Sequence, residues 1–113
     1  MAKTADDVRP ELVEFTTLLK AHYDLYALVL FGSHAQGTAS ASSDIDVAVF
    51  SDDFGKDILG EMKNLFKLRR LIDTDIEPLP FSKSDFFEHG PADFVRQILT
   101  TGKVIFREGR FYE

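Results

Sequence analysis

Two short apolar segments constrain the fold of this 113-residue chain more than any other feature. Residues 25–31 read LYALVLF, and residues 47–50 read VAVF. Unbroken apolar runs of this length, rich in β-branched and aromatic side chains, are typical of strands inside a covered sheet. We therefore expect buried strands at 25–31 and 44–50, with the polar residues between them forming a loop beside both.

The residues that connect these two strands carry the chemistry. Gly32 and Ser33 follow the first strand directly, and Asp44 and Asp46 begin the second. Side chains alternate along a strand, so the two aspartates point to the same side. Their carboxylates repel each other unless a cation lies between them, and Mg²⁺ prefers hard oxygen ligands. Because Gly32 lets a ligand approach the backbone and Ser33 offers a hydroxyl and an N–H, the pattern predicts a site for Mg²⁺ and a nucleoside triphosphate.

These residues resemble the signature of a known superfamily. Gly32-Ser33, a ten-residue spacer and Asp44-x-Asp46 are similar to the motif of the polymerase-beta-like nucleotidyltransferases. The short chain is most similar to their minimal nucleotidyltransferase branch, whose better-understood members are antitoxins encoded beside HEPN-domain toxins. The likeness extends over about residues 12–106. It implies an α/β fold, with a small mixed sheet and helices packed on one face. It also implies Mg²⁺-dependent transfer of AMP from ATP, with Gly32 and Ser33 at the nucleotide.

A third carboxylate is expected if the site uses two metal ions. Residues 72–81 alternate in polarity, with Asp73, Asp75 and Glu77 on one side of an expected strand. In the superfamily the third acid precedes an alternating segment that ends near proline, and Asp75 fits this pattern best. Glu77 lies on the same side and is the alternative. The resemblance thus implies Asp44, Asp46 and Asp75 as the catalytic and metal-binding residues.

The remaining elements follow from apolar periodicity and from proline and glycine signals. The expected helices are 6–23, 56–70, 82–88 and 91–101, and the expected strands are 72–81 and 103–106. A helical turn is expected at 32–36. Arg69 and Arg70 would end the second long helix, where a cation interacts favourably with the helix dipole. His34, alone in its loop, is interpreted as polar surface.

Composition narrows the class of protein. Thirteen Lys and Arg against 19 Asp and Glu give a net charge of −6, which argues against binding to an extended nucleic acid. The chain has no cysteine and no apolar run near the length of a membrane span. We therefore expect one domain over residues 1–113, in the cytoplasm and not in a membrane.

Three functional hypotheses remain open. The first is AMP transfer from ATP to a hydroxyl, which by resemblance would be a tyrosine of a HEPN-type toxin. The second is an antitoxin of the same fold that acts by binding alone. It is favoured by His34 and Gln36, which stand where family members often carry arginines. The third is adenylylation of a small molecule such as an aminoglycoside. The sequence leaves open the acceptor, the preferred base, the choice between Asp75 and Glu77, and whether the chain forms homo- or hetero-oligomers.

Overall fold

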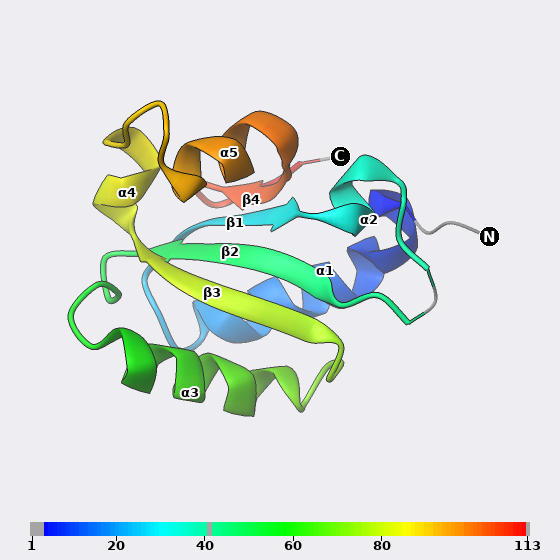
Figure 1. The fold of residues 1–113 in the computed structure, drawn as a ribbon. Helices are drawn as coiled ribbons and strands as arrows, with labels where there is room; N and C mark the ends of the chain where they lie inside the picture. Colours follow the sequence, from blue (N-terminus) through cyan, green and yellow to red (C-terminus); the bar gives the residue numbers. More distant parts are fainter. Residues whose placement is uncertain (1–3, 41, 113) are drawn as a thin grey trace.

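The computed structural model describes residues 4–40 and 42–112 of the chain, which form a mixed five-stranded sheet with helices packed against it (Figure 1). The order along the chain is α1 (Ala5–Lys20), β1 (Leu25–Phe31), α2 (Ser33–Gln36), β2 (Ile45–Ser51), α3 (Ile58–Arg69), β3 (Ile76–Ser82), α4 (Lys83–Phe87), α5 (Phe94–Thr101), β4 (Lys103–Arg107) and β5 (Arg110–Phe111). Within these residues, no helix combines the length and the apolar character needed to cross a membrane.

The strand order across the sheet is β3-β2-β1-β4-β5. The central strand β1 pairs antiparallel with β2 on one side and with β4 on the other. By contrast, β2 and β3 are parallel, and α3 provides the crossover that a parallel connection requires. The predicted fold class, α/β with a small mixed sheet, is confirmed.

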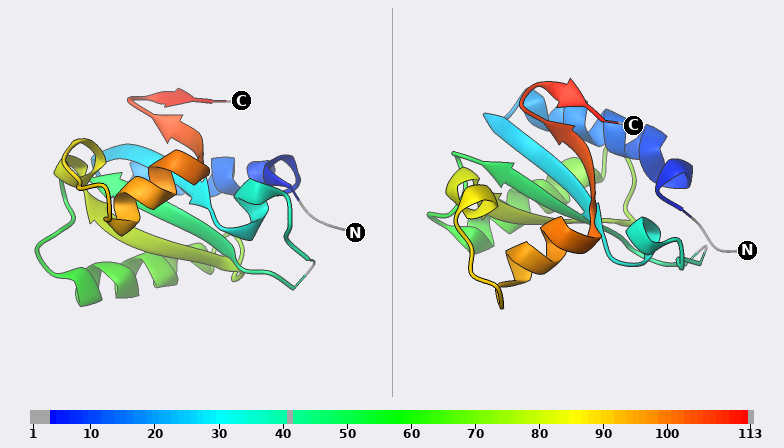
Figure 2. Two further views of the ribbon diagram at one scale, coloured as in Figure 1. Left: turned by 45° about the horizontal axis from the view of Figure 1, so that its top comes forward. Right: turned by 90° about the horizontal axis from the view of Figure 1, so that it is seen from above.

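One face of the sheet is covered by the two long helices. Figure 2 shows α1 and α3 on the same side of the strands. Apolar side chains recur along α1 at helical spacing, and their buried face meets alternate residues of β1 and β2. The buried members of this core from the two helices and the two strands are Val8, Leu12, Phe15, Leu19, Leu65, Leu28, Leu30, Ile45, Val47 and Val49. This arrangement gives the domain its larger apolar core.

The opposite face carries a smaller core beneath α4 and α5. Alternate strand residues that point away from the first core meet Val95 and Ile98 of α5. The strand members are Tyr26, Ala27, Val29, Ala48 and Phe50. The sequence analysis placed helices on one face only, whereas the two short helices form a second layer over part of the other face. The remainder of this second face contains Asp46, because Asp46, Ala48 and Phe50 alternate along β2.

The start of β3 differs from the sequence prediction. Residues 72–75, expected as strand, form a turn after α3, in which the Asp73 N–H donates to the Arg69 carbonyl over 2.8 Å. The Asp75 N–H donates to Asp73 Oδ1, also over 2.8 Å. These local bonds compete with the strand ladder, so pairing begins at Ile76. Pro78 and Pro80 have no N–H to donate. Because β3 is the edge strand and no strand lies on its outer side, this costs the sheet no hydrogen bond there.

The helix α3 offers a direct test of this packing. Leu65 is fully buried between α3 and the sheet, whereas Leu59 on the same helix is 77% exposed. We expect Leu65→Ala to lower the free energy of unfolding by about 2–5 kcal/mol, through lost burial and the cavity left behind. Leu59→Ala should change it by less than about 0.5 kcal/mol. Urea denaturation of both variants measures the difference, and equal losses would contradict the assigned face of α3.

Candidate functional site

The turn between β1 and α2 forms one wall of the site. Gly32 has a φ of +75°, and the Gln36 N–H donates to its carbonyl over 3.2 Å, which closes the short helix α2. A Cβ atom at Gly32 would lie only 2.6 Å from Oδ2 of Asp46. Glycine is thus required twice, for its backbone conformation and for this close approach. The predicted proximity of the Gly32-Ser33 turn and the acidic pair is present in the structure.

The carboxylates come together through the register of three strands. Asp46 on β2 is the direct neighbour of Phe31 on β1 and of Glu77 on β3. Residues paired in this way lie on the same face of a sheet, with their strands about 4.8 Å apart. Asp44 lies just before β2, two residues before Asp46 and on the same side. The strands β2 and β3 run side by side from this end of the sheet (Figure 1).

The electrostatics of this group show mutual repulsion. Burial raises the pKa of Asp46, the charge of Asp44 raises it further, and His34 partly offsets the two effects. Burial also raises the pKa of Glu77, as do the charges of Asp44 and Asp46, while Arg69 lowers it. The Asp44 and Glu77 carboxyl groups are also within hydrogen-bonding reach of each other. A cation at this point would relieve a repulsion that the fold otherwise leaves in place.

Asp75 is placed differently from the sequence prediction. It is exposed in the turn before β3, and its carbonyl accepts the Ile45 N–H over 2.8 Å. Its backbone therefore helps to align β3 with β2. Asp75 is not among the charges that shift the pKa of Asp46 or Glu77. The structure brings Asp44, Asp46 and Glu77 together, so the role of third carboxylate passes in our proposal from Asp75 to Glu77.

His34 is a buried residue and not the surface residue that the sequence analysis expected. Its side chain is 1% exposed, and Nδ1 lies 3.1 Å from the carbonyl oxygen of Asp44. A carbonyl oxygen can only accept a hydrogen bond, so Nδ1 carries the hydrogen and is the donor. Nε2 is buried and has no hydrogen-bond partner among residues 4–40 and 42–112. The prediction was wrong because α2 turns its second residue inward, a direction that a four-residue helix does not reveal in its sequence.

Arg69 is a site residue that the sequence analysis assigned only to the helix dipole. From the last position of α3, its Nη1 donates to the Ile76 carbonyl over 2.8 Å. The guanidinium lies over the Phe66 ring, 4.3 Å from the ring centre. Arg69 thus holds the first residue of β3, and its charge acts on Glu77 one residue later. The only sequence signal was its position a few residues before an acidic strand.

The donor set fits a hard divalent cation such as Mg²⁺. The side chains that converge are carboxylates, the ligands that Mg²⁺ prefers, and the absence of a side chain at Gly32 leaves space for the Asp46 carboxylate. In the described part of the chain, no three His, Cys, Asp or Glu side chains are already close enough to hold a metal ion alone. A bound cation would therefore also need oxygen ligands from its substrate, as Mg²⁺ commonly does with phosphates. Metal binding at Asp44, Asp46 and a third acid stays a prediction.

The two glycines that flank α2 permit a comparative test of the close contact between Gly32 and Asp46. Gly32 and Gly37 both have a φ of +75°, but a Cβ at Gly37 would meet nothing within 4 Å. Alanine at Gly37 carries the strain of the left-handed helical region, about 1 kcal/mol, whereas Gly32, with a ψ of −152°, lies in a region that is essentially restricted to glycine, so its backbone strain is larger. Only Gly32→Ala adds the collision with Asp46, so we expect it to lower the free energy of unfolding distinctly more than Gly37→Ala. Chemical denaturation measures both, and equal losses would show that the turn and Asp46 are not in contact.

The repulsion among the carboxylates predicts a pH-dependent stability. Because the pKa of Glu77 is raised in the folded protein, the folded state holds this proton more tightly than the unfolded chain. Stability is therefore lost as the pH rises from the ordinary glutamate pKa through the raised one. With a chelator present, Glu77→Gln should increase the free energy of unfolding at neutral pH, and the increase should vanish in acid. Denaturation across a pH series tests this, with Asp75→Asn as the exposed control that should show no such gain.

Comparison with known proteins agrees with the fold. The family model described as "Polymerase beta, Nucleotidyltransferase" matches residues 14–110. A protein from Sulfolobus solfataricus, described as a candidate nucleotidyltransferase, has a TM-score of 0.66 and 12% identity, covering 100% of this chain and 96% of its own. A chain of the toxin–antitoxin MntA–HpeT, solved as a tyrosine-to-alanine mutant, has a TM-score of 0.59 and 28% identity, covering 84% of this chain and 71% of its own. No curated protein sequence matches. The chain belongs to the polymerase beta nucleotidyltransferase family.

Proposed function

We propose that this protein is a Mg²⁺-dependent nucleotidyltransferase that transfers AMP from ATP to a hydroxyl group of a partner protein. The observation that carries the proposal is the convergence of Asp44, Asp46 and Glu77 beside the Gly32 turn, in a chain of the nucleotidyltransferase family. Family membership supports the reaction class. The electrostatic repulsion among the acids supports the need for a divalent cation.

Each residue has a physical role in this reaction. The backbone at Gly32 and the hydroxyl of Ser33 would bind phosphate oxygens, while Asp44 and Asp46 would hold Mg²⁺. When bound, Mg²⁺ supplies neutralisation of phosphate charge and lowers the pKa of the acceptor hydroxyl. The acceptor oxygen bonds to the α-phosphorus, and the bond to pyrophosphate breaks as pyrophosphate leaves with the electron pair. The hydroxyl proton passes to the Glu77 carboxylate, which lies beside Asp46 on the β3 side of the site.

The partner is proposed to be a toxin. A chain that is 28% identical forms part of the toxin–antitoxin MntA–HpeT, and the sequence resembles antitoxins encoded beside HEPN-domain toxins. We therefore propose that the acceptor is a tyrosine of such a toxin and that the transfer neutralises it. The isolated domain should bind Mg-ATP but turn it over slowly, because the acceptor arrives with the partner.

One observation favours an alternative, an antitoxin that acts by binding alone. His34 is buried, with Nδ1 committed to the Asp44 carbonyl, so it does not replace an arginine at the phosphates. Arg69 does not supply this charge either, because it lies on the Glu77 side of the acids, away from the Gly32 turn.

A reconstitution with four forms of the protein separates these functions. Wild-type protein, Mg-ATP and the product of the adjacent gene are mixed, and intact-mass spectrometry records whether the partner gains the mass of one or more AMP groups. We expect Asp46→Asn and Glu77→Gln to reduce the modification by about a hundredfold or more, and Asp75→Asn to retain it. Size-exclusion chromatography should show that all four still associate with the partner.

The outcomes are distinct. Loss of activity in Asp75→Asn with an active Glu77→Gln would restore Asp75 as the third acid. Neutralisation of the toxin by Asp46→Asn, with no mass added, would favour the binding antitoxin. A chelator should abolish the modification by the wild-type protein, whereas activity in its presence would exclude the metal-dependent reaction.

A further inference from the structure

An apolar groove of about 470 Å³ lies on the outer side of the carboxylates. Its walls are α3, the second half of β3 and the beginning of α5, with α4 at one end. The apolar residues that line it include Ile58, Met62, Leu79, Phe81 and Phe94. Ile58 and Phe94, on its two rims, are 57% and 50% exposed. Large apolar side chains left this exposed beside a groove are characteristic of a binding surface.

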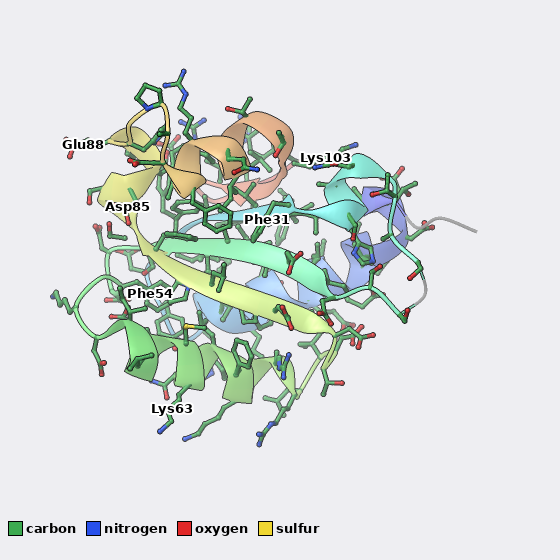
Figure 3. All side chains as sticks on the ribbon, in the orientation of Figure 1. Phe31, Phe54, Lys63, Asp85, Glu88 and Lys103 are labelled. Atoms are coloured by element: carbon green, nitrogen blue, oxygen red, sulfur yellow. The ribbon has the colours of Figure 1, made fainter. Side chains whose placement is uncertain are left out.

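Two residues that line the groove lie close to the site. Leu79 follows Glu77 by two residues on the same side of β3, a step of about 7 Å along a strand. On the other wall, Phe94 contacts Phe31 with ring centres 5.7 Å apart, and Phe31 is the strand neighbour of Asp46. Figure 3 shows Phe31 between the sheet and α5. A molecule in the groove that extends past Leu79 toward the start of β3 would therefore reach Glu77.

The order of the strands decides which substrate the groove receives. Across the sheet, the Gly32 turn on β1 comes first, Asp46 on β2 second and Glu77 on β3 third. In the proposed function, on which this inference rests, the turn binds the triphosphate and Glu77 receives the acceptor proton. The acceptor then approaches from the β3 side, which is the side of the groove.

The charge around the groove indicates the chemistry of the occupant. Three carboxylates line it, those of Asp85, Glu88 and Asp93, and no Lys or Arg lines it among the described residues. Figure 3 shows Asp85 and Glu88 together at the α4 end. Asp85 accepts the backbone N–H of Ser82, and Asp93 accepts that of Gly90. A partner with basic side chains beside an apolar face complements this surface.

The edge of β3 excludes one mode of binding. Pro78 and Pro80 have no N–H to offer an added strand, and Arg69 already occupies the carbonyl of Ile76. We propose that the groove binds an amphipathic helix of the acceptor protein, whose apolar face fills the groove and whose lysines or arginines contact Asp85, Glu88 and Asp93. This docking brings the acceptor hydroxyl to Glu77.

Peptide binding tests the groove without knowledge of the partner. The probes are fluorescent helical peptides with a leucine face and a tyrosine, flanked either by lysines or by glutamates. We expect the lysine peptide to bind and the glutamate peptide to bind at least about tenfold more weakly, by fluorescence anisotropy. Ile58→Ser should weaken binding of the lysine peptide at least about fivefold, because it removes an apolar contact on the rim. Leu59→Ser is the matched control, since Leu59 is the next residue on α3, is more exposed and does not line the groove.

A charge reversal provides the second arm. Glu88→Lys should weaken the lysine peptide and strengthen the glutamate peptide, with both effects reduced at high salt. Glu14 is an exposed residue of α1, on the opposite face of the sheet from α4. Glu14→Lys makes the same charge change and should alter the affinity for either peptide by no more than about twofold. Equal binding of the two peptides, no binding of the lysine peptide, or equal effects of Ile58→Ser and Leu59→Ser would overturn the proposal.

Other occupants would be recognised by the same measurements. Competition by free adenosine would make the groove a nucleoside site, and a dimer that sedimentation shows to depend on Ile58 would make it a self-association surface; either result overturns the inference. Asp46→Asn keeps the groove intact, so it should bind the lysine peptide as the wild-type protein does. Peptide binding without any AMP transfer would contradict the proposed reaction but would support the docking surface. AMP transfer to the partner that is unaffected by Ile58→Ser would support the reaction but would contradict the docking surface.

Discussion

The parallel pairing of β2 with β3 is the contact on which the candidate site depends. The bond from the Ile45 N–H to the Asp75 carbonyl begins the ladder, and the register that follows puts Glu77 beside Asp46. A shift of one residue would place an apolar or proline side chain there and would turn Glu77 to the other face. The crossover through α3 makes this pairing possible, and Arg69 at the end of that helix holds the first residue of β3.

Two basic side chains flank the acidic group, and each holds backbone as well as acting through charge. His34 donates to the Asp44 carbonyl from the α2 side, and Arg69 donates to the Ile76 carbonyl from the α3 side. Each offsets part of the rise in the pKa of a neighbouring carboxyl group, His34 for Asp46 and Arg69 for Glu77. The repulsion that remains favours a bound divalent cation. The two basic residues therefore position the carboxylates without fully compensating their negative charge.

The two faces of the sheet differ in how much of them the helices cover. The face under α1 and α3 holds the larger apolar core and supplies most of the burial. The other face is only partly covered by α4 and α5, which leaves one end for the carboxylates and the adjoining strip along β3 for the groove. An uncovered strip of sheet costs apolar burial, and a surface that receives a partner regains it on binding.

The sequence by itself determined the strands β1 and β2, the two long helices and the segment that carries the candidate site. The apolar runs of β1 and β2 predict buried strands from composition alone, and Gly32, Asp44 and Asp46 lie within one short segment, so local spacing was sufficient to group them. Only the tertiary structure shows which acid lies beside Asp46, the burial of His34, the contacts of Arg69 and the layer formed by α4 and α5. Asp75 and Glu77 lie on the same side of the strand predicted from the sequence, so the alternation of residues there does not show which of them is the third acid. The choice between them came from where the turn after α3 ends and which residue of β3 meets Asp46, and pairing between strands that are distant in sequence is not encoded in either strand alone.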